Sequence, residues 1–313
     1  MKFDRKMFQP FLRSFARQGL IFLVWIFKVG PYWLVHGVAR ALLRFALLFM
    51  GKQGKVAIDS LQVAFGKEKT LEELKQILRR CGDTFIEDAI ELLYFLAHPE
   101  KARDYVTFEG KENLDAALKK GNGVIALTAH YGNFPLMMLG AVQMGYPTNC
   151  VIKPARDTKM SDYLLKKREK IGLKTIFTNP RNQCAGQCIK ALRNNEIIFL
   201  LADQNFGAKG GVFVEFFGQK AGTATGPVVF AQRTGAAIVP MFAVRQSDGK
   251  HKIFIEPEYK LEHDDDEQKM FEVNMGNITK IIENYIRKYP HEWAWMHRRW
   301  KSRPPEEEKD VTV

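Results

Sequence analysis

Hydrophobic and polar positions follow two periods in turn along residues 70–260. Short, mostly apolar runs such as 123–129 and 196–202 alternate with longer segments in which apolar residues recur every three or four positions. The short runs predict buried strands and the longer segments predict amphipathic helices. Strands and helices that alternate in this way predict an α/β fold, with a mixed, largely parallel sheet flanked by helices.

The predicted strands and helices can be placed along the chain. Strands are expected at residues 123–129, 148–153, 174–178, 196–202, 211–218, 238–246 and 251–259, the last one antiparallel at a sheet edge. Helices are expected at residues 70–97, 111–121, 134–145, 158–172, 182–195, 225–235 and 268–290. Thr70 and Glu73 have the spacing of a capping box at the start of the first of these helices.

The N-terminal region predicts a membrane element. Residues 18–39 carry one formal charge, Lys28, and as a helix would reach about 33 Å, close to the thickness of a bilayer core. A charge in mid-span is costly, and Gly30-Pro31 should break the helix just after it. The segment therefore predicts either a helical hairpin seated in the membrane or a tilted single span, with a buried helix pair as the alternative.

Basic residues after the break predict contact with a membrane surface. His36, Arg40 and Arg44 recur every four residues beside apolar neighbours, which is typical of an interfacial helix with a cationic stripe toward lipid headgroups. A cleavable signal peptide is not expected, because no small-residue cleavage site follows the apolar run. The predicted organisation is a membrane-associated segment at 1–55, one domain at 56–302 and a polar, disordered tail at 303–313.

Composition narrows the choice of partners. The 313 residues are 46% hydrophobic, enough for a substantial core, and the net charge of +12 predicts an anionic partner such as nucleic acid, anionic lipid or an acidic protein. A nucleic-acid partner is not expected, since the sequence contains no helix-turn-helix, zinc-finger or RNP pattern. The four cysteines contain no C-x-x-C pair, so we expect free thiols and no structural zinc.

Two polar residues follow predicted strands directly and carry the candidate chemistry. His130 comes after the strand at 123–129, and Asp203 comes after the strand at 196–202. If these strands are neighbours in a parallel sheet, both side chains reach one cleft at its carboxyl edge. Gly132 and Asn133 permit unusual backbone angles before a helix, whose free N–H groups could stabilise an oxyanion.

The chemistry expected at this cleft is acyl transfer. A neutral imidazole can take a proton from a hydroxyl group while that hydroxyl attacks an activated carbonyl. No serine or cysteine lies within two residues of His130, and the chain contains no G-x-S-x-G. We therefore expect direct transfer without a covalent enzyme intermediate.

Several motifs resemble those of one known family. HYGNFPL at 130–136, ADQ at 202–204, FFG at 216–218, the T-x-T-G-P run at 223–227 followed by GAAIVP, and W-x-H-R-R-W-K around His297 are similar, in order and spacing, to the bacterial late acyltransferases of lipid A biosynthesis. These enzymes belong to the wider lysophospholipid acyltransferase superfamily. The resemblance covers nearly the whole chain, including the N-terminal segment.

The resemblance implies an enzyme on the cytoplasmic side of the inner membrane. It would move a fatty acyl chain from acyl carrier protein, or from a coenzyme A thioester, to a hydroxyl of a lipid A precursor or related membrane glycolipid. It would use no metal and no cofactor, and His130 would be the general base of the family's H-x4-D/E motif. Acyl carrier protein is acidic, which suits the basic chain.

One position departs from the family pattern. The acidic residue of H-x4-D/E should fall at 135, where this sequence has Pro135. Proline is tolerated in the first turn of a helix, so the fold is not affected. Three interpretations remain open: Asp203 orients His130, or His130 works without a carboxylate, or the site is inactive and the protein is a membrane lipid-binding or scaffolding protein.

Further residues are candidates for substrate binding. Arg168 matches a family arginine expected at phosphate or headgroup, or else lies on a solvated helix face. Gly218, Thr225 and Gly226 would shape the cleft wall, although Thr225 and Pro227 also fit a plain helix start. A C-terminal cluster combines basic residues with tryptophans: His297, Arg298, Arg299 and Lys301 with Trp293, Trp295 and Trp300. The basic residues could bind phosphate or carrier protein, while the tryptophans could lie in the membrane interface or close the core.

Overall fold

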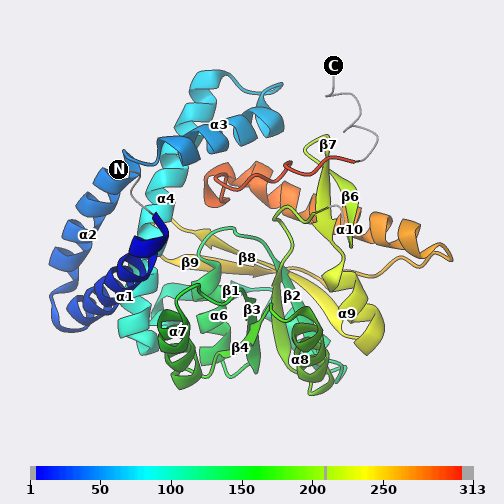
Figure 1. The fold of residues 1–313 in the computed structure, drawn as a ribbon. Helices are drawn as coiled ribbons and strands as arrows, with labels where there is room; N and C mark the ends of the chain where they lie inside the picture. The colour runs from blue at the N-terminus through cyan, green and yellow to red at the C-terminus, as the bar shows by residue number, and fades with distance from the viewer. Residues whose placement is uncertain (1–4, 208–209, 305–313) are drawn as a thin grey trace.

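The computed structural model describes residues 5–207 and 210–304, and its centre is a seven-stranded sheet with helices on both sides (Figure 1). The strands lie in the order β1 (Val106–Glu109), β9 (His251–Ile255), β8 (Ala237–Arg245), β2 (Val124–Thr128), β5 (Ile197–Leu201), β3 (Thr148–Ile152) and β4 (Lys174–Phe177). All neighbouring pairs are parallel except β8 and β9. The predicted α/β fold with a mixed, largely parallel sheet is confirmed.

The sheet differs from the prediction at one edge. The last strand, β9, is antiparallel to β8 as expected, but it is not the edge strand, because β1 pairs with its other side. A second two-stranded sheet, β6 (Gly211–Phe216) with β7 (Gln219–Ala224), was predicted only in its first half. The sequence of β7, QKAGTA, has no apolar alternation, so a period-based prediction misses it.

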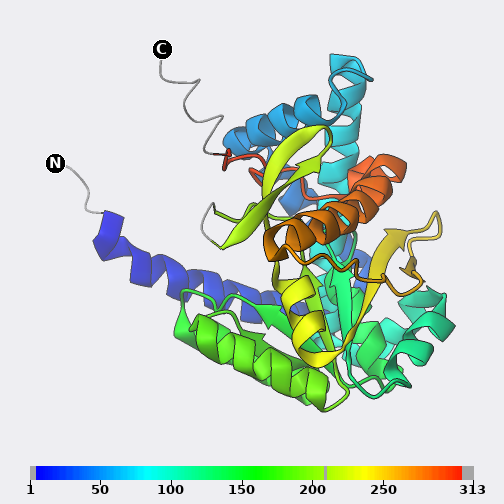
Figure 2. The same cartoon turned by 90° about the vertical axis from the view of Figure 1, so that its right-hand side faces the viewer.

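Ten α-helices lie within the described part of the chain. They are α1 (Arg5–Val29), α2 (Tyr32–Leu47), α3 (Gly51–Phe65), α4 (Leu71–Ala97), α5 (Lys111–Leu118), α6 (Phe134–Gln143), α7 (Thr158–Lys170), α8 (Arg181–Arg193), α9 (Gly226–Thr234) and α10 (Glu267–Lys288). The capping box of α4 is present, with the Thr70 side chain accepting from the Glu73 N–H and the Glu73 carboxylate accepting in return. Figure 2 shows α10 lying along the β6–β7 hairpin.

The N-terminal helices break where the sequence predicts. The predicted apolar span 18–39 is divided between α1 and α2 at Gly30-Pro31, and both helices pack against α4 with Phe27 and Ala39 buried. None of the described helices is by itself both long and apolar enough to cross a membrane. By length and composition, only α2 and α3 together pass that test, bent by 79° at the break between them. The prediction of a tilted single span is therefore corrected.

The predicted cationic stripe of α2 faces protein. His36 and Arg40 contact the Glu87 carboxylate at 2.8 and 2.9 Å, and Arg44 contacts Asp83 at 2.7 Å. Both acids lie on α4, so the stripe is paired with acidic side chains there. This corrects the prediction that these side chains point toward lipid headgroups.

The C-terminal segment closes the core, and its tryptophans are not at the surface. Trp293, Trp295 and Trp300 are buried and stack edge-on or face-on with each other and with Phe216 and Phe217. Their placement corrects the membrane-interface alternative. The predicted tail at 303–313 lies outside the described residues from 305 onward.

Candidate active site

Neighbouring strands bring His130 and Asp203 together. Strands β2 and β5 are parallel, with Thr128 opposite Leu201, and the ladder continues as the Ala202 N–H donates to the Thr128 carbonyl at 3.0 Å. His130 and Asp203 each lie two residues beyond these partners. The matched register places both side chains at the carboxyl edge of the sheet, where parallel sheets bind ligands.

The Asp203 carboxylate is buried and holds His130 from two directions. One oxygen contacts the imidazole Nδ1 at 2.9 Å, while the other accepts from the His130 backbone N–H at 3.0 Å and from the Trp293 indole N–H at 2.8 Å. Burial alone would raise the pKa of Asp203, but these hydrogen bonds, led by that from His130, hold the pKa below its ordinary value. The carboxylate is therefore ionised at neutral pH.

The contacts of the ring fix which nitrogen carries the proton. An ionised carboxylate can only accept, so Nδ1 carries a hydrogen toward Asp203, and in the neutral ring Nε2 then carries the lone pair. The amide nitrogen of Gln204 lies 3.1 Å from Nε2 and donates to it. The side chain of His130 is 32% exposed, so Nε2 is presented at an opening and is not packed inward. This tautomer is the one that a general base requires.

Gly132 and Asn133 shape the turn that carries His130 into helix α6. Gly132 has φ +52°, and a Cβ there would lie 2.0 Å from the Ala243 carbonyl oxygen, so only glycine fits. The Asn133 side chain caps α6 by accepting from the Leu136 N–H at 3.0 Å and donates to Glu91 at 2.7 Å. Both residues position the turn.

The first N–H groups of α6 all have partners or are absent. Phe134 donates to the Gly132 carbonyl, Leu136 donates to the Asn133 side chain, and Pro135 has no N–H. The prediction that this helix N-terminus supplies an oxyanion site is therefore corrected. The Gln204 amide, which the ADQ run contained but sequence reasoning did not single out, is the donor beside Nε2.

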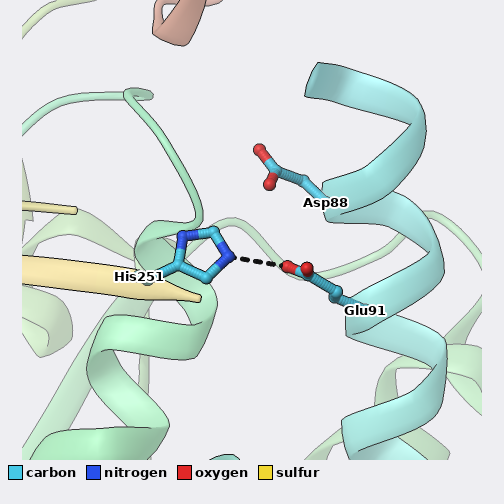
Figure 3. A group of neighbouring side chains, drawn as sticks. All are labelled: Asp88, Glu91 and His251. Atoms are coloured by element: carbon cyan, nitrogen blue, oxygen red, sulfur yellow. Dashed lines mark hydrogen bonds and ion pairs between the residues drawn. The ribbon is translucent and has the colours of Figure 1, made fainter. Parts of the chain in front are cut away.

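Asp88, Glu91 and His251 form a largely buried cluster (Figure 3), which Asn133 contacts through Glu91. His251 on β9 contacts the Glu91 carboxylate at 2.8 Å. The Arg245 guanidinium contacts Asp88 and Glu91, each at 2.6 Å, and so supplies the positive charge that these acids need. Burial would raise the pKa of Glu91, but His251 and Arg245 hold it below its ordinary value. The cluster is a charge network that anchors Asn133, and we assign no metal to it.

A largely apolar cavity of about 610 Å³ opens beside His130; we call it the donor cavity. Its walls come from α4, α6, α7, β3 and β5, and they include Phe95, Leu96, Leu136, Met138, Leu139, Val151, Leu164, Leu173 and Leu200. Pro135 lies in this wall, where an acidic side chain would place a charge against apolar neighbours. The cavity has the size and lining of a site for one extended hydrocarbon chain.

The predicted binding residues divide into two groups. Arg168, at the end of α7, lines the donor cavity, and Arg298 is exposed on the C-terminal segment. Arg299 is fully buried, donates to the Gly222 carbonyl and the Thr223 hydroxyl at 2.6 Å, and has its pKa lowered to about 10 by burial. Its role as a ligand contact is corrected, because the side chain is buried and both terminal nitrogens of its guanidinium already donate to β7.

The remaining candidates lie in turns. Gly218 has φ +73° in the β6–β7 hairpin turn, next to Phe217 at φ +53°. Thr225 and Gly226 begin α9, with Pro227 in the first turn. None of the three lines the donor cavity as described, so the plain turn and helix-start interpretation fits them.

Comparison with known proteins agrees with this geometry. Residues 4–302 match the family described as "Bacterial lipid A biosynthesis acyltransferase". The chain is 26% identical to the lipid A biosynthesis palmitoleoyltransferase of Escherichia coli (strain K12), covering 97% of this chain and 96% of that protein. It is 27% identical to the lauroyltransferase of the same organism over 90% of each. It is also 28% identical to a phosphatidylinositol mannoside acyltransferase of Mycobacterium tuberculosis over 42% of each.

Proposed function

The chain belongs to the bacterial lipid A biosynthesis acyltransferase family, and we propose that it transfers a fatty acyl chain from a thioester donor to a hydroxyl group of a glycolipid, with His130 as general base. The donor is acyl carrier protein or, alternatively, coenzyme A carrying the acyl chain. The acceptor is a lipid A precursor or a related glycolipid, since the relatives named above act on lipid A or on phosphatidylinositol mannoside. No metal or cofactor takes part.

One observation carries this proposal: the Nε2 lone pair of His130 faces the mouth of an apolar cavity while Asp203 holds the opposite ring nitrogen. The acyl chain lies in the donor cavity with its thioester carbonyl beside Nε2. As the acceptor oxygen attacks that carbonyl, Nε2 takes its proton. The tetrahedral intermediate then expels the carrier thiolate, which takes the proton back from the imidazolium.

Asp203 replaces the acid missing at position 135. It makes the contacts that orient a catalytic imidazole, and its negative charge stabilises the imidazolium formed during transfer. These contacts favour the first of the three interpretations of Pro135 over an unaided histidine or an inactive site.

Gln204 is the proposed donor to the oxyanion. In the resting protein its amide N–H is directed at Nε2 from 3.1 Å. When the acceptor hydroxyl occupies the base, the amide is free to donate to the thioester oxygen on which negative charge develops. Arg168, in the wall of the same cavity, is the proposed contact for a phosphate of the donor or acceptor.

The proposed location is the cytoplasmic side of the inner membrane, with α1 and α2 as an attachment surface. Large apolar side chains are exposed on these helices and in the turn after α2; Phe15, Trp33, Leu48 and Phe49 are each more than 70% exposed. Contiguous apolar surface of this kind marks a membrane or partner contact. The helical-hairpin form of the sequence prediction is the one we retain.

The test is His130→Ala in purified protein, assayed with acyl carrier protein loaded with a labelled chain and with lipid extracts as acceptor. We expect transfer to fall by about 10²- to 10⁴-fold, with an unchanged melting temperature. His98→Ala is the matched control, because His98 lies away from the donor cavity. Full transfer by His130→Ala, or none by the unmodified chain with any donor, contradicts the proposal.

A further inference from the structure

Two further hollows meet the active site beside the donor cavity. The first, of about 370 Å³, is lined by Phe85, Ala89 and Leu92 of α4 together with Trp293 and Met296; we call it the α4 hollow. His130 and Pro135 lie in its wall as well as in that of the donor cavity. A second chain-sized apolar space therefore begins at the same imidazole.

The second space, of about 600 Å³, is strongly basic; we call it the basic hollow. Lys52, His297, Arg298 and Lys301 line it, and no acidic residue does. Lys52, Arg298 and Lys301 have no ion-pair partner among residues 5–207 and 210–304. Three basic side chains without an acid create a field that attracts a compact anion such as a phosphate.

The basic hollow is joined to the active site from two sides. Met296 lines both it and the α4 hollow, and Asn205 lines it directly after Gln204, the residue that contacts Nε2. Asn205 is held in place by its N–H donating to His297 at 2.9 Å and by its side chain pairing with Ser302. The donor cavity and the α4 hollow thus share His130 in their walls, and the basic hollow adjoins them through Met296 and Asn205.

We propose that the acceptor is an anionic lipid that is divided between the two further hollows. Its hydrocarbon chain lies in the α4 hollow, its phosphate lies in the basic hollow, and its hydroxyl, at the junction of chain and headgroup, reaches Nε2 of His130. This inference rests on the proposed function and adds a recognition rule. A lipid of the same chain length without negative charge binds less tightly.

The arrangement also separates the two substrates. The spaces proposed for the donor chain and the acceptor chain share a wall that includes Phe134 and Pro135. An acid at 135 would add a charge to both largely apolar spaces, whereas proline adds none; Asp88 and Glu292 are the acids already in the lining of the α4 hollow. The substitution of the family's acid is thereby compatible with two chains bound side by side.

Direct binding tests this proposal without relying on turnover. The probes are a lysophosphatidic acid, which carries one chain, a free hydroxyl and a phosphate, and the monoacylglycerol of the same chain, which lacks the phosphate. Binding to the full chain is measured by calorimetry below the lipid's micelle concentration. For Arg298→Gln/Lys301→Gln we expect about a tenfold rise in Kd for the phosphate-bearing lipid and no change for the monoacylglycerol. Arg193→Gln/Lys250→Gln, the same loss of charge elsewhere on the surface, should change neither.

Filling each apolar space assigns the chain. Ala89→Trp, which fills the α4 hollow, should weaken the binding of both lipids, while Leu139→Trp in the donor cavity should change the binding of neither. Melting temperatures verify that each variant is folded. If Ala89→Trp is unstable, Ala89→Leu replaces it. Three outcomes would overturn the proposal. The first is that Leu139→Trp weakens lipid binding while Ala89→Trp does not. The second is that the charge variants affect both lipids equally, and the third is that they change only the KM for acyl carrier protein. Lipid binding as proposed without any acyl transfer would instead count against the proposed function alone.

Discussion

At the scale of single residues, the proposed chemistry depends on one buried carboxylate, that of Asp203. Asp203 has three hydrogen bonds, and two of them go to the same residue, His130. An acid at 135 would approach the ring from its own helix, whereas Asp203 approaches from the neighbouring strand. Both routes can orient an imidazole, because orientation requires only an acceptor within hydrogen-bond distance of Nδ1.

Replacing Asp203 by asparagine tests the orienting role. An amide can donate to Nδ1, which would move the ring proton to Nε2 and leave no lone pair for the acceptor. We expect kcat for Asp203→Asn to fall about 10³- to 10⁴-fold, measured with saturating donor and acceptor. Trp293→Phe, which removes only one bond to the carboxylate, should cost far less. Near-normal activity of Asp203→Asn would show that the histidine works unaided.

Gln204 gives a second residue-scale prediction. If its amide stabilises the developing oxyanion, Gln204→Leu should lower kcat about 10²- to 10³-fold and leave the KM for both substrates nearly unchanged. Steady-state kinetics with each substrate varied in turn measures this. Gln204→Asn, which keeps an amide on a shorter side chain, should retain part of the activity. A rise in kcat for Gln204→Leu would instead mean that the contact with Nε2 only blocks the base.

At the scale of elements, packing and exposure divide the N-terminal helices into two faces. The basic side chains of α2 pair with Glu87 and Asp83 of α4, and Val35, Leu43 and Leu47 pack against the core. Its remaining large apolar side chains face outward: Trp33, Leu34, Val38, Leu42 and Phe45. Periodicity predicts that such a helix has two faces. It does not predict which face meets the protein, because that depends on the acids of α4, which lie some forty residues further along the chain.

The outward face predicts membrane binding that depends on specific side chains. Trp33→Ser/Phe49→Ser removes two of its most exposed apolar groups, and we expect the partition coefficient onto anionic vesicles to fall about tenfold or more. Sedimentation with vesicles measures it. Leu71→Ser, which also removes an exposed apolar side chain but on α4, serves as control. Equal effects of both changes would argue against an attachment surface on α1 and α2.

At the scale of the whole molecule, the site is assembled from segments distant in sequence. The turn after β2 carries His130, the proposed base, and the loop after β5 carries its partner Asp203. Helix α4 anchors Asn133 through Glu91, and the C-terminal segment supplies Trp293. Glu292 joins these parts, since its backbone carbonyl accepts from the Gly132 N–H at 2.8 Å while its side chain is buried. Stability of the fold and geometry of the site are therefore linked.

The burial of Glu292 predicts a pH effect on stability. Burial, together with nearby Asp88, raises the pKa of Glu292 to about 7, above its ordinary value of 4.5 in the unfolded chain. Its favourable contribution is complete below the unfolded value and is lost as the pH rises through 7. Glu292→Gln should therefore be more stable than the parent at pH 8, by up to about 3 kcal/mol, and nearly equal at pH 4.5. Urea unfolding at both pH values measures the difference, and a pH-independent difference would contradict it.

The fold class and the pairing of His130 with Asp203 could be predicted from the sequence because both depend on local signals. Short apolar runs identified the central strands, and a polar residue directly after a strand must lie at its carboxyl end. β1 and β7 were not predicted from the sequence. The VTFE sequence of β1 alternates over only four residues, and the QKAGTA sequence of β7 does not alternate; their pairing with β9 and β6 makes them strands. The role of Arg299 was mistaken for the same reason: charge predicts exposure unless a distant carbonyl supplies a buried partner.

By itself, the sequence determined the α/β architecture, the break at Gly30-Pro31 and the family, and it singled out His130 as the candidate base, because each follows from neighbours along the chain. Tertiary structure alone decided which nitrogen of His130 is free, which face of α2 is exposed, and that α6 has no spare N–H for an oxyanion. It also decided where three hollows meet. These properties depend on contacts between atoms far apart in sequence, and residue order specifies such contacts only through the completed fold.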